Sequence, residues 1–272
     1  MTPTSPKHSS GLHIIRSVLA DIRMEGFQFT KAEETLFQEI GLSKTTTTEA
    51  RQNLLSKFQQ QREKEPQAFI DATPGAEMKS AGTPYIYLET NILINNLGIN
   101  NQSLLQEAER NLTGFRMIDL WRNPLKGNFD FKHLLAIHQS IFQDIFPWAG
   151  KIRTVNIGKA GSWFCWSEHI DSYQQEIFGR LKKENCLVGL EVAEFANHAA
   201  KFLGDLNALH PFREGNGRTQ REFLRCLALN AGYRINLSDI TQEYMIFASR
   251  ESFNGNYQEF ERIIKNRLEL IR

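Results

Sequence analysis

Residues 210–221 bring together side chains that could bind a polyphosphate. Their sequence is HPFREGNGRTQR, and it lies between two helical patterns. Gly215 and Gly217 allow the backbone to approach a ligand closely, and they present N–H groups at the start of a helix, where anions bind. Arg218 and Arg221 lie three residues apart on one helix face, and a guanidinium can bind phosphate with two hydrogen bonds. The segment therefore predicts a polyphosphate site.

Three further polar residues indicate what happens to that phosphate. Asn216 adds a side-chain donor to the anion site. Glu214 would repel phosphate unless a cation lay between them, and Mg²⁺ binds one carboxylate together with phosphate oxygens. His210 ends the preceding helix, and its imidazole changes charge near neutral pH, so it is the candidate general base for a hydroxyl that attacks phosphorus. The loop thus predicts a nucleotide site that activates a nucleophile.

A structural alternative exists for each of these residues taken alone. A histidine beside a proline is commonly structural, and Gly-Asn-Gly is a common turn. Eight specified positions in a fixed register arise by chance in a chain of 272 residues with odds on the order of 1 in 10⁷. Taken jointly, the residues favour the functional interpretation.

The elements that must position this loop are mostly helical, because apolar residues recur every three or four positions over most of the chain. Helices are expected at about 12–26, 30–40, 45–62, 101–111, 115–123, 131–143, 167–184, 190–209, 217–231, 241–252 and 257–270. Segment 152–166 differs, since Val155 and Ile157 alternate with polar residues and two glycines follow. That pattern predicts a β-hairpin. We therefore expect an all-α fold that carries one hairpin.

A stretch rich in proline and alanine divides the chain. Residues 65–84 contain three prolines and keep no helical or alternating period, which is typical of a linker. We expect a small helical module over 1–64, a linker over 65–83 and the main domain over 84–272. Three short helices have too little core to be stable alone, so we expect the module to dock on something larger.

Composition excludes several classes of protein. Hydrophobic residues make up 41% and charged residues 23% of the chain, and the net charge is +1, so neither disorder nor general binding of nucleic acid or anionic membrane is expected. No apolar run approaches the roughly 20 residues of a membrane helix, and no secretory signal is recognisable. Cys165, Cys186 and Cys226 form no CxxC pair, which suits a reducing compartment.

Residues 210–221 match every specified position of the signature H-x-F-x-[D/E]-G-N-G-R-x-x-R, and in this the chain resembles the Fic family. The resemblance extends over about 84–270. Residues 134–157 resemble the segment that leads into the family's hairpin flap, and residues 85–87 and 91–99 resemble the start of Fic cores in secreted Bartonella-type effectors. It implies a Fic-like helical core with a β-hairpin flap, which transfers AMP from ATP to a target hydroxyl and releases pyrophosphate.

The resemblance also implies roles for individual positions of the loop. His210 would take the proton from the target hydroxyl, and Glu214 would hold Mg²⁺ against the α- and β-phosphates. Asn216 and the backbone near Gly215 and Gly217 would orient the α-phosphate. The two arginines would bind the outer phosphates, Arg218 the β-phosphate and Arg221 the γ-phosphate.

The hairpin at 152–166 would be the flap, which binds an extended target segment by strand addition. Trp163 and Phe164 could clamp the target side chain, although packing on the core is an equal alternative for both. The candidate target-docking residues of the flap are Lys159, Ser162, Trp163 and Phe164.

The N-terminal helices resemble small Fic antitoxins over residues 18–26. Many Fic proteins are inhibited by a helix with the motif [S/T]-x-x-x-E-[G/N], whose glutamate pairs with the second arginine of the signature. Here Glu25 and Gly26 match that motif, whereas Asp21 replaces its hydroxyl residue. The resemblance implies that Glu25 pairs with Arg221 and blocks the γ-phosphate site. The alternative is that a glutamate before a C-capping glycine merely ends a helix.

Together these features predict an auto-inhibited protein adenylyltransferase that uses ATP and Mg²⁺. Its partners would be a hydroxyl-bearing target protein and the antitoxin-like segment in cis, with no nucleic acid and no membrane. We expect it in the cytoplasm of a bacterium, or secreted into host cells as an effector. The alternatives are a catalytically silent Fic-fold interaction protein and a Fic enzyme that transfers a different nucleotide. A DNA-binding helical module is disfavoured by the balanced charge.

Overall fold

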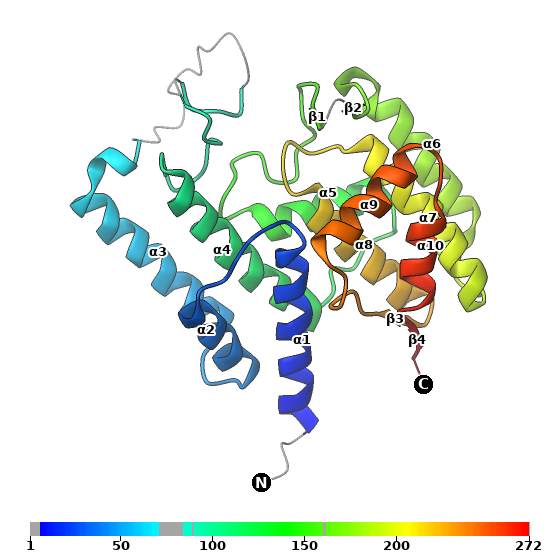
Figure 1. Cartoon of the computed structure of the whole chain (residues 1–272), viewed down its shortest axis with the longest axis horizontal. Coiled ribbons are helices and arrows are strands. Elements are labelled where there is room, and N and C mark those ends of the chain that lie inside the picture. Colours follow the sequence, from blue (N-terminus) through cyan, green and yellow to red (C-terminus); the bar gives the residue numbers. More distant parts are fainter. Residues whose placement is uncertain (1–5, 71–83, 89, 160–161, 272) are drawn as a thin grey trace. The chain divides into compact units, whose positions relative to one another are not determined.

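Helices dominate both units of the structure, as the apolar periodicity predicts (Figure 1). The computed structural model describes residues 6–70, 84–88, 90–159 and 162–271, with side chains from residue 11. One unit comprises residues 1–19, 27–123 and 140–149, and the other comprises 20–26, 124–139 and 150–272. Helices α1 and α5 each contribute residues to both units. The prediction of an all-α fold with a hairpin is confirmed.

The first unit is built from amphipathic helices with well-defined starts. Its elements are α1 (Pro6–Arg23, up to residue 19), α2 (Lys31–Gly41), α3 (Thr47–Lys64), a 3₁₀ turn (Pro66–Ala68), α4 (Gln102–Arg122) and the end of α5. Thr30 and Glu33 form a capping box at the start of α2, and Thr46 and Glu49 form another at the start of α3.

The predicted break near residue 112 is absent, since α4 is one helix where two were expected. Gly114 lies inside α4 and is buried, and Thr113 donates its hydroxyl to the Glu109 carbonyl at 2.7 Å. A glycine within a helix costs about 1 kcal/mol relative to alanine. Packing of the helix against α3 and burial of residues such as Leu112 and Phe115 outweigh that cost.

The second unit surrounds one central helix. Its elements are the start of α5 (Phe131–Phe142, up to residue 139), β1 (Gly158–Lys159), β2 (Ser162–Trp163), a 3₁₀ turn (Ser167–His169), α6 (Ile170–Lys183), a second turn (Asn185–Leu187), α7 (Val192–Leu209), α8 (Asn216–Asn230), β3 (Tyr233–Ile235), α9 (Gln242–Phe253), α10 (Gln258–Lys265) and β4 (Leu268–Leu270). Helix α7 packs against α6, α8, α9 and α10 (Figure 1). The loop between α7 and α8 is residues 210–215.

Two short sheets differ from the expectations in extent. In the flap, only Gly158 pairs with Trp163 and Lys159 with Ser162, with residues 160–161 outside the described part. The helix expected over 257–270 ends at Lys265, and residues 268–270 pair instead with β3 as an antiparallel strand. Hydrogen bonding to a partner strand distant in sequence overrides the local helical pattern there.

The division into a module, a linker and a main domain stays a prediction. Residues 71–83 of the expected linker lie outside the described residues, whereas Phe69 forms a bridge with Ile99. Among the described residues, no helix has both the length and the apolar character that crossing a membrane requires.

Candidate active site

The loop between α7 and α8 turns sharply at two residues with positive φ. His210 caps the C-terminus of α7 with φ 45°, and Gly215 precedes α8 with φ 81°. Glycine adopts that conformation readily, whereas a histidine does so only where its surroundings enforce it. The turn puts the imidazole at the end of one helix and the glycine-rich segment at the start of the next.

Asn216 closes this loop on itself. Its Oδ1 accepts from the Phe212 N–H at 3.0 Å, and its Nδ2 donates to the Phe212 carbonyl at 2.8 Å. Both residues are buried. The contact of Asn216 with the α-phosphate stays a prediction, and the structure gives its side chain a positioning role.

His138, which the sequence reasoning missed, holds the same loop from α5. Its Nδ1 accepts the Gly150 N–H at 2.8 Å, so its Nε2 carries the hydrogen and donates to the Glu214 carbonyl at 3.0 Å. The ring stacks on Phe212 with 3.8 Å between centroids. Burial lowers the pKa of His138 to about 3, so the imidazole stays neutral and keeps this donor and acceptor arrangement.

His210 has one ring nitrogen engaged. Nδ1 lies 3.2 Å from the Asn207 carbonyl, which can only accept, so Nδ1 carries the hydrogen and Nε2 has a lone pair. The Phe164 ring stacks on the imidazole with 3.7 Å between centroids and an interplanar angle of 11°. Burial lowers the pKa of His210 to about 4, and the nearby Arg153 charge adds to the shift. His210 is therefore a neutral base at neutral pH.

A buried arginine, which the sequence reasoning also missed, joins the flap to this loop. Arg153 donates to the carbonyls of His210 (2.8 Å), Val155 (2.7 Å), Cys165 and Leu209 (3.3 Å). Its backbone N–H donates to the Pro211 carbonyl at 2.9 Å. One guanidinium thereby fixes both ends of the flap against the end of α7. The residue lies within the segment 134–157, but its type alone does not indicate this role.

The start of α8 presents the expected cationic groups. Arg218 is fully buried, and its Nη2 lies 3.9 Å from Oε1 of the partly exposed Glu214. The same Glu214 oxygen accepts the Gly215 N–H at 2.9 Å. The structure therefore brings together His210, Glu214, Gly215, Asn216, Gly217, Arg218 and Arg221.

Two carboxylates from residues 20–26 meet Arg221. Its Nη2 donates to Glu25 Oε1 at 2.6 Å and to the Asp21 carbonyl at 3.2 Å, and its Nε donates to Asp21 Oδ1. A Cβ on Gly217 would collide with Glu25 Oε1. The Glu25 carboxylate therefore lies against the backbone at the second residue of α8, where an anion would bind.

The pKa directions follow from these contacts. Burial opposes ionisation of Glu25, but the charges of Arg221 and Arg218 outweigh it and lower the pKa of Glu25. Burial raises the pKa of Asp21 to about 6, even though the Arg221 charge opposes the shift. Burial also opposes the charged form of Arg221, yet the two carboxylates prevail and raise the pKa of that guanidinium.

Of the predicted flap residues, Phe164 lies against His210. Trp163 is 59% exposed and stacks on Trp166 with 5.8 Å between centroids. Lys159 and Ser162 are exposed on β1 and β2. Docking of a target on these residues, and clamping by Trp163 and Phe164, stay predictions.

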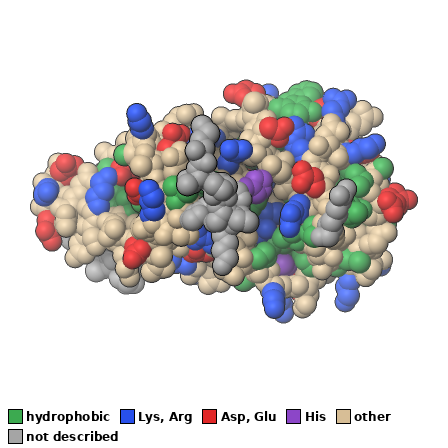
Figure 2. All heavy atoms as spheres, turned by 90° about the horizontal axis from the view of Figure 1, so that it is seen from below, with side chains coloured by type: hydrophobic (Ala, Val, Ile, Leu, Met, Phe, Trp, Pro, Cys, Tyr) green, Lys and Arg blue, Asp and Glu red, His purple; other side chains and the backbone are tan. Residues whose placement is uncertain are grey.

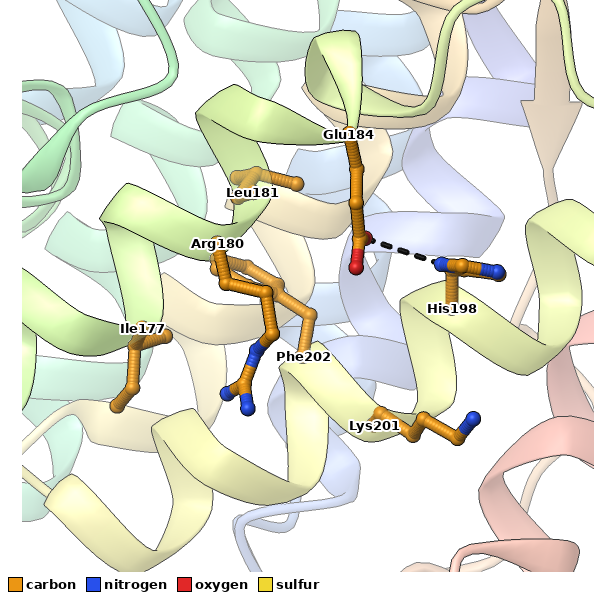
Figure 3. Close-up of a pocket in the computed structure, with 7 residues that line it drawn as sticks. All are labelled: Ile177, Arg180, Leu181, Glu184, His198, Lys201 and Phe202. Carbon is orange, nitrogen blue, oxygen red and sulfur yellow. Dashed lines mark ion pairs between the residues drawn. The ribbon is translucent and has the colours of Figure 1, made fainter.

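A separate small pocket lies between α6 and α7 (Figure 3). Its lining residues are Ile177, Arg180, Leu181, Glu184, His198, Lys201 and Phe202. Glu184 and His198 face one another, with 3.0 Å between Oε2 and Nδ1. None of the predicted site residues lines this pocket, so it is not a candidate for the nucleotide site.

Charges of both signs are interspersed on the face of the molecule that Figure 2 shows. On the face shown in Figure 2, the Lys and Arg side chains of the described residues are scattered among Asp and Glu. This distribution agrees with the net charge of +1 and gives no support to a DNA-binding module.

Comparison with known proteins adds a family and several relatives. Residues 128–228 match the sequence model of the Fic/DOC family. The chain is 40% identical over 190 residues to protein adenylyltransferase VbhT of Bartonella schoenbuchensis, covering 70% of this chain and 40% of VbhT. It is 34% identical over 180 residues to the probable protein adenylyltransferase Fic of Escherichia coli, covering 66% of this chain and 89% of that protein.

Solved structures of Fic domains are also similar to this chain. One is the N-terminal Fic domain of a Bartonella quintana effector with bound ADP, at 32% identity and a TM-score of 0.66, covering 68% of this chain and 94% of that one. Another is BepC of Bartonella tribocorum with bound AMPPNP, at 29% identity and a TM-score of 0.66, covering 69% of this chain and 97% of that one. The chain thus spans less than half of VbhT but nearly all of these Fic domains.

Proposed function

The chain belongs to the Fic/DOC family, and we propose that it is a protein adenylyltransferase that transfers AMP from ATP to a hydroxyl side chain of a target protein. The observation that carries this proposal is the segment 210–221, which comprises the loop between α7 and α8 and the start of α8. It joins a neutral imidazole with a lone pair on Nε2 to a helix N-terminus and two buried arginines. The adenylyltransferase names of the relatives and the nucleotides bound to BepC and the Bartonella quintana domain support it.

In the proposed mechanism the start of α8 holds the polyphosphate. The backbone near Gly215 and Gly217 orients the α-phosphate, Arg218 binds the β-phosphate and Arg221 the γ-phosphate. Buried guanidiniums and helix N-terminal N–H groups stabilise the charge on phosphate oxygens more strongly than water-exposed groups do. Most of the catalysis is then positioning of the reacting atoms together with this electrostatic stabilisation.

The chemical step is one displacement at phosphorus. The target hydroxyl oxygen attacks the α-phosphorus, its proton passes to His210 Nε2, and the bond from the α-phosphorus to the bridging oxygen breaks as pyrophosphate leaves. The negative phosphates bound beside the imidazole raise its pKa from the low value of the nucleotide-free protein. His210 therefore becomes a stronger base when ATP is present.

The residues present fit a magnesium ion that is shared with the nucleotide. Among the described residues no group of three or more His, Cys, Asp or Glu side chains could hold a metal by itself. Glu214 is a partly exposed carboxylate beside the phosphate-binding segment, and Mg²⁺ is held in nucleotide sites by one or two carboxylates plus phosphate oxygens and waters. Bound there, Mg²⁺ would neutralise charge on the α- and β-phosphates.

Auto-inhibition by Glu25 is the second part of the proposal. The Glu25 carboxylate pairs with Arg221 and lies against Gly217, and on this proposal it competes with the γ-phosphate for Arg221. A charge-assisted hydrogen bond of this kind, within a buried site, competes directly with phosphate. On this proposal the nucleotide binds productively only when Glu25 moves away or is replaced.

The target would bind along the flap by strand addition, with its hydroxyl directed to His210. The exposed strands β1 and β2 support this placement, since β-edges bind extended segments through main-chain hydrogen bonds. The relation to translocated Bartonella effectors is proposed from the relatives, and the relation to antitoxins is proposed from the resemblance of residues 18–26 alone.

Transfer of label from ATP tests the proposed function. The full chain with Glu25→Gly is incubated with ATP labelled on the α-phosphate and with bacterial or host lysate, and labelled bands are identified by mass spectrometry. We expect label with Glu25→Gly and none with the further change His210→Ala. Absence of label with every variant would favour a silent interaction protein, and label from another nucleotide only would favour the alternative transferase.

A further inference from the structure

Arg221 faces two carboxylates, and only one of them belongs to the inhibitory glutamate. Asp21 Oδ1 accepts from Nε, and the Asp21 carbonyl accepts from Nη2 at 3.2 Å. Asp21 and Arg221 are both buried, at 7% exposure each. Removal of the Glu25 side chain therefore leaves the guanidinium with a second negative partner in a poorly hydrated site.

We infer that Asp21 is a specificity-determining residue that weakens discrimination for the terminal phosphate of the nucleotide, independently of Glu25. The inference rests on the proposed placement of the γ-phosphate at Arg221. A paired carboxylate cancels much of the guanidinium charge that a γ-phosphate would meet, and it repels the phosphate as well. The consequence is that the preference of the site for binding ATP over ADP is weakened.

Asp21 lies closer to the arginine that would bind the terminal phosphate than to the one that would bind the β-phosphate. The Asp21 carboxylate accepts a hydrogen bond from Arg221, whereas the charge of Arg218 has a smaller effect on Asp21 than that of Arg221. Nη1 of Arg221 lies 2.9 Å from the position that a Cβ on Gly217 would take, so the end of the guanidinium is directed to the helix N-terminus. Asp21 binds the opposite edge. Its charge consequently acts mainly on a ligand at Arg221 and less on one at Arg218.

Ionisation supports the inference at neutral pH. Burial raises the pKa of Asp21 only to about 6, so the group is mostly charged at pH 7. The charged groups that act on it among the described residues are Arg221, Glu25 and Arg218, and Arg225 of the same helix α8 also interacts with its charge.

Asp21→Asn is the decisive substitution, because it removes the charge but keeps a carbonyl oxygen that can accept from Arg221 Nε. Dissociation constants for ATP and ADP are measured by calorimetry, in the full chain with Glu25→Gly and His210→Ala to prevent turnover. We expect Asp21→Asn to lower the dissociation constant for ATP about tenfold. A change of this size is expected from removing one unit charge near a phosphate in a partly shielded site. The ADP constant should stay nearly unchanged.

A matched control is Asp239→Asn, which removes a carboxylate from an exposed pair with Arg267 (2.7 and 2.8 Å). It should change neither constant. Asp21→Ser is a second variant for use if Asp21→Asn lowers the melting temperature, and it should shift the ATP constant in the same direction.

Equal changes for ATP and ADP, or weaker ATP binding by Asp21→Asn, would overturn the assignment and leave Asp21 a purely structural partner of Arg221. The two proposals fail separately. A shift in the ATP to ADP ratio without AMP transfer by the Glu25→Gly protein overturns the proposed function but not this inference. AMP transfer by the Glu25→Gly protein without a shift in the ATP to ADP ratio overturns this inference but not the proposed function.

Discussion

At the scale of single residues, the site depends on two imidazoles that the protein keeps neutral for different purposes. His138 has both ring nitrogens engaged, with Gly150 and Glu214, so it can position the loop but has no lone pair left for a substrate. His210 has a hydrogen bond from Nδ1 to the Asn207 carbonyl, and no described residue is hydrogen-bonded to Nε2, which leaves a lone pair there for a substrate. The hydrogen-bond partners, and not the residue type, thus separate the structural histidine from the candidate base.

The pH dependence of transfer tests the state of His210. Its pKa is lowered to about 4 by burial, so the folded protein disfavours the protonated form, and base function is lost only as pH falls well below the usual histidine value of about 6.5. In the Glu25→Gly protein we expect the acid limb of kcat/KM for ATP, which reports the nucleotide-free enzyme, to lie below pH 6. The Glu25 charge raises the pKa of His210, so its loss in this variant moves the acid limb to still lower pH. An acid limb at or above pH 6.5 would contradict the assignment.

Asn216 gives a stability prediction at the same scale. Asn216→Ala leaves the buried Phe212 N–H without its 3.0 Å acceptor, and an unsatisfied buried donor costs about 1–3 kcal/mol. We expect the free energy of unfolding, from urea titration, to fall by that amount. Asn230→Ala, at the exposed end of the same helix, serves as the control and should change it by less than about 0.5 kcal/mol.

At the scale of elements, the flap and the loop act as one assembly through Arg153. Because this guanidinium donates to carbonyls on both sides of the hairpin and at the end of α7, the position of β1 and β2 is coupled to that of His210. Strand pairing contributes little here, since β1 and β2 have two residues each.

Arg153→Lys tests this coupling. A lysine ammonium has three donors on a flexible stem and cannot reproduce the planar fork, so we expect kcat/KM for AMP transfer in the Glu25→Gly background to fall about tenfold or more. The melting temperature should fall as well. Arg234→Lys, an exposed change on β3, is the control; if it lowers transfer as much as Arg153→Lys, the coupling is wrong.

The parts of the fold that could be predicted are those that depend on residues close together in sequence. The segment 210–221 was recognisable because its residues are adjacent in sequence, and so was the start of α2, where Thr30 and Glu33 cap locally. The continuity of α4 through Gly114 depends on packing against α3, and the strand at 268–270 depends on pairing with β3. Contacts between residues distant in sequence decide both, and periodicity does not reveal them.

The same reason explains which site residues were missed. His138 and Arg153 join the loop only through tertiary contacts with residues 57 to 76 positions away. Asp21 was visible as a departure from a motif, but its contact with Arg221 bridges 200 positions. The sequence could therefore indicate the chemistry of the loop and Glu25, but not the residues that support them.

At the scale of the whole molecule, a nearly neutral chain buries two arginines at the start of one helix. The net charge is +1, yet Arg218 and Arg221 are buried side by side at the start of α8, where Glu25 and Asp21 supply the compensating charge. Residues 20–26 belong to the same compact unit as α8, although they are nearly 200 positions apart in sequence. The proposed inhibitor and the proposed enzyme site are thus one folded unit.

The rate of AMP transfer by the full chain with Glu25→Gly, compared with the unaltered chain at saturating target, tests the central claim most directly. On the proposed placement of the γ-phosphate at Arg221, the Glu25 carboxylate has to leave first, so we predict a rise of at least about tenfold, corresponding to roughly 1.4 kcal/mol of inhibition. The further change His210→Ala should abolish this transfer while ATP still binds. Equal, robust transfer by the unaltered and Glu25→Gly chains would contradict inhibition by Glu25, and transfer that survives His210→Ala would contradict the mechanism.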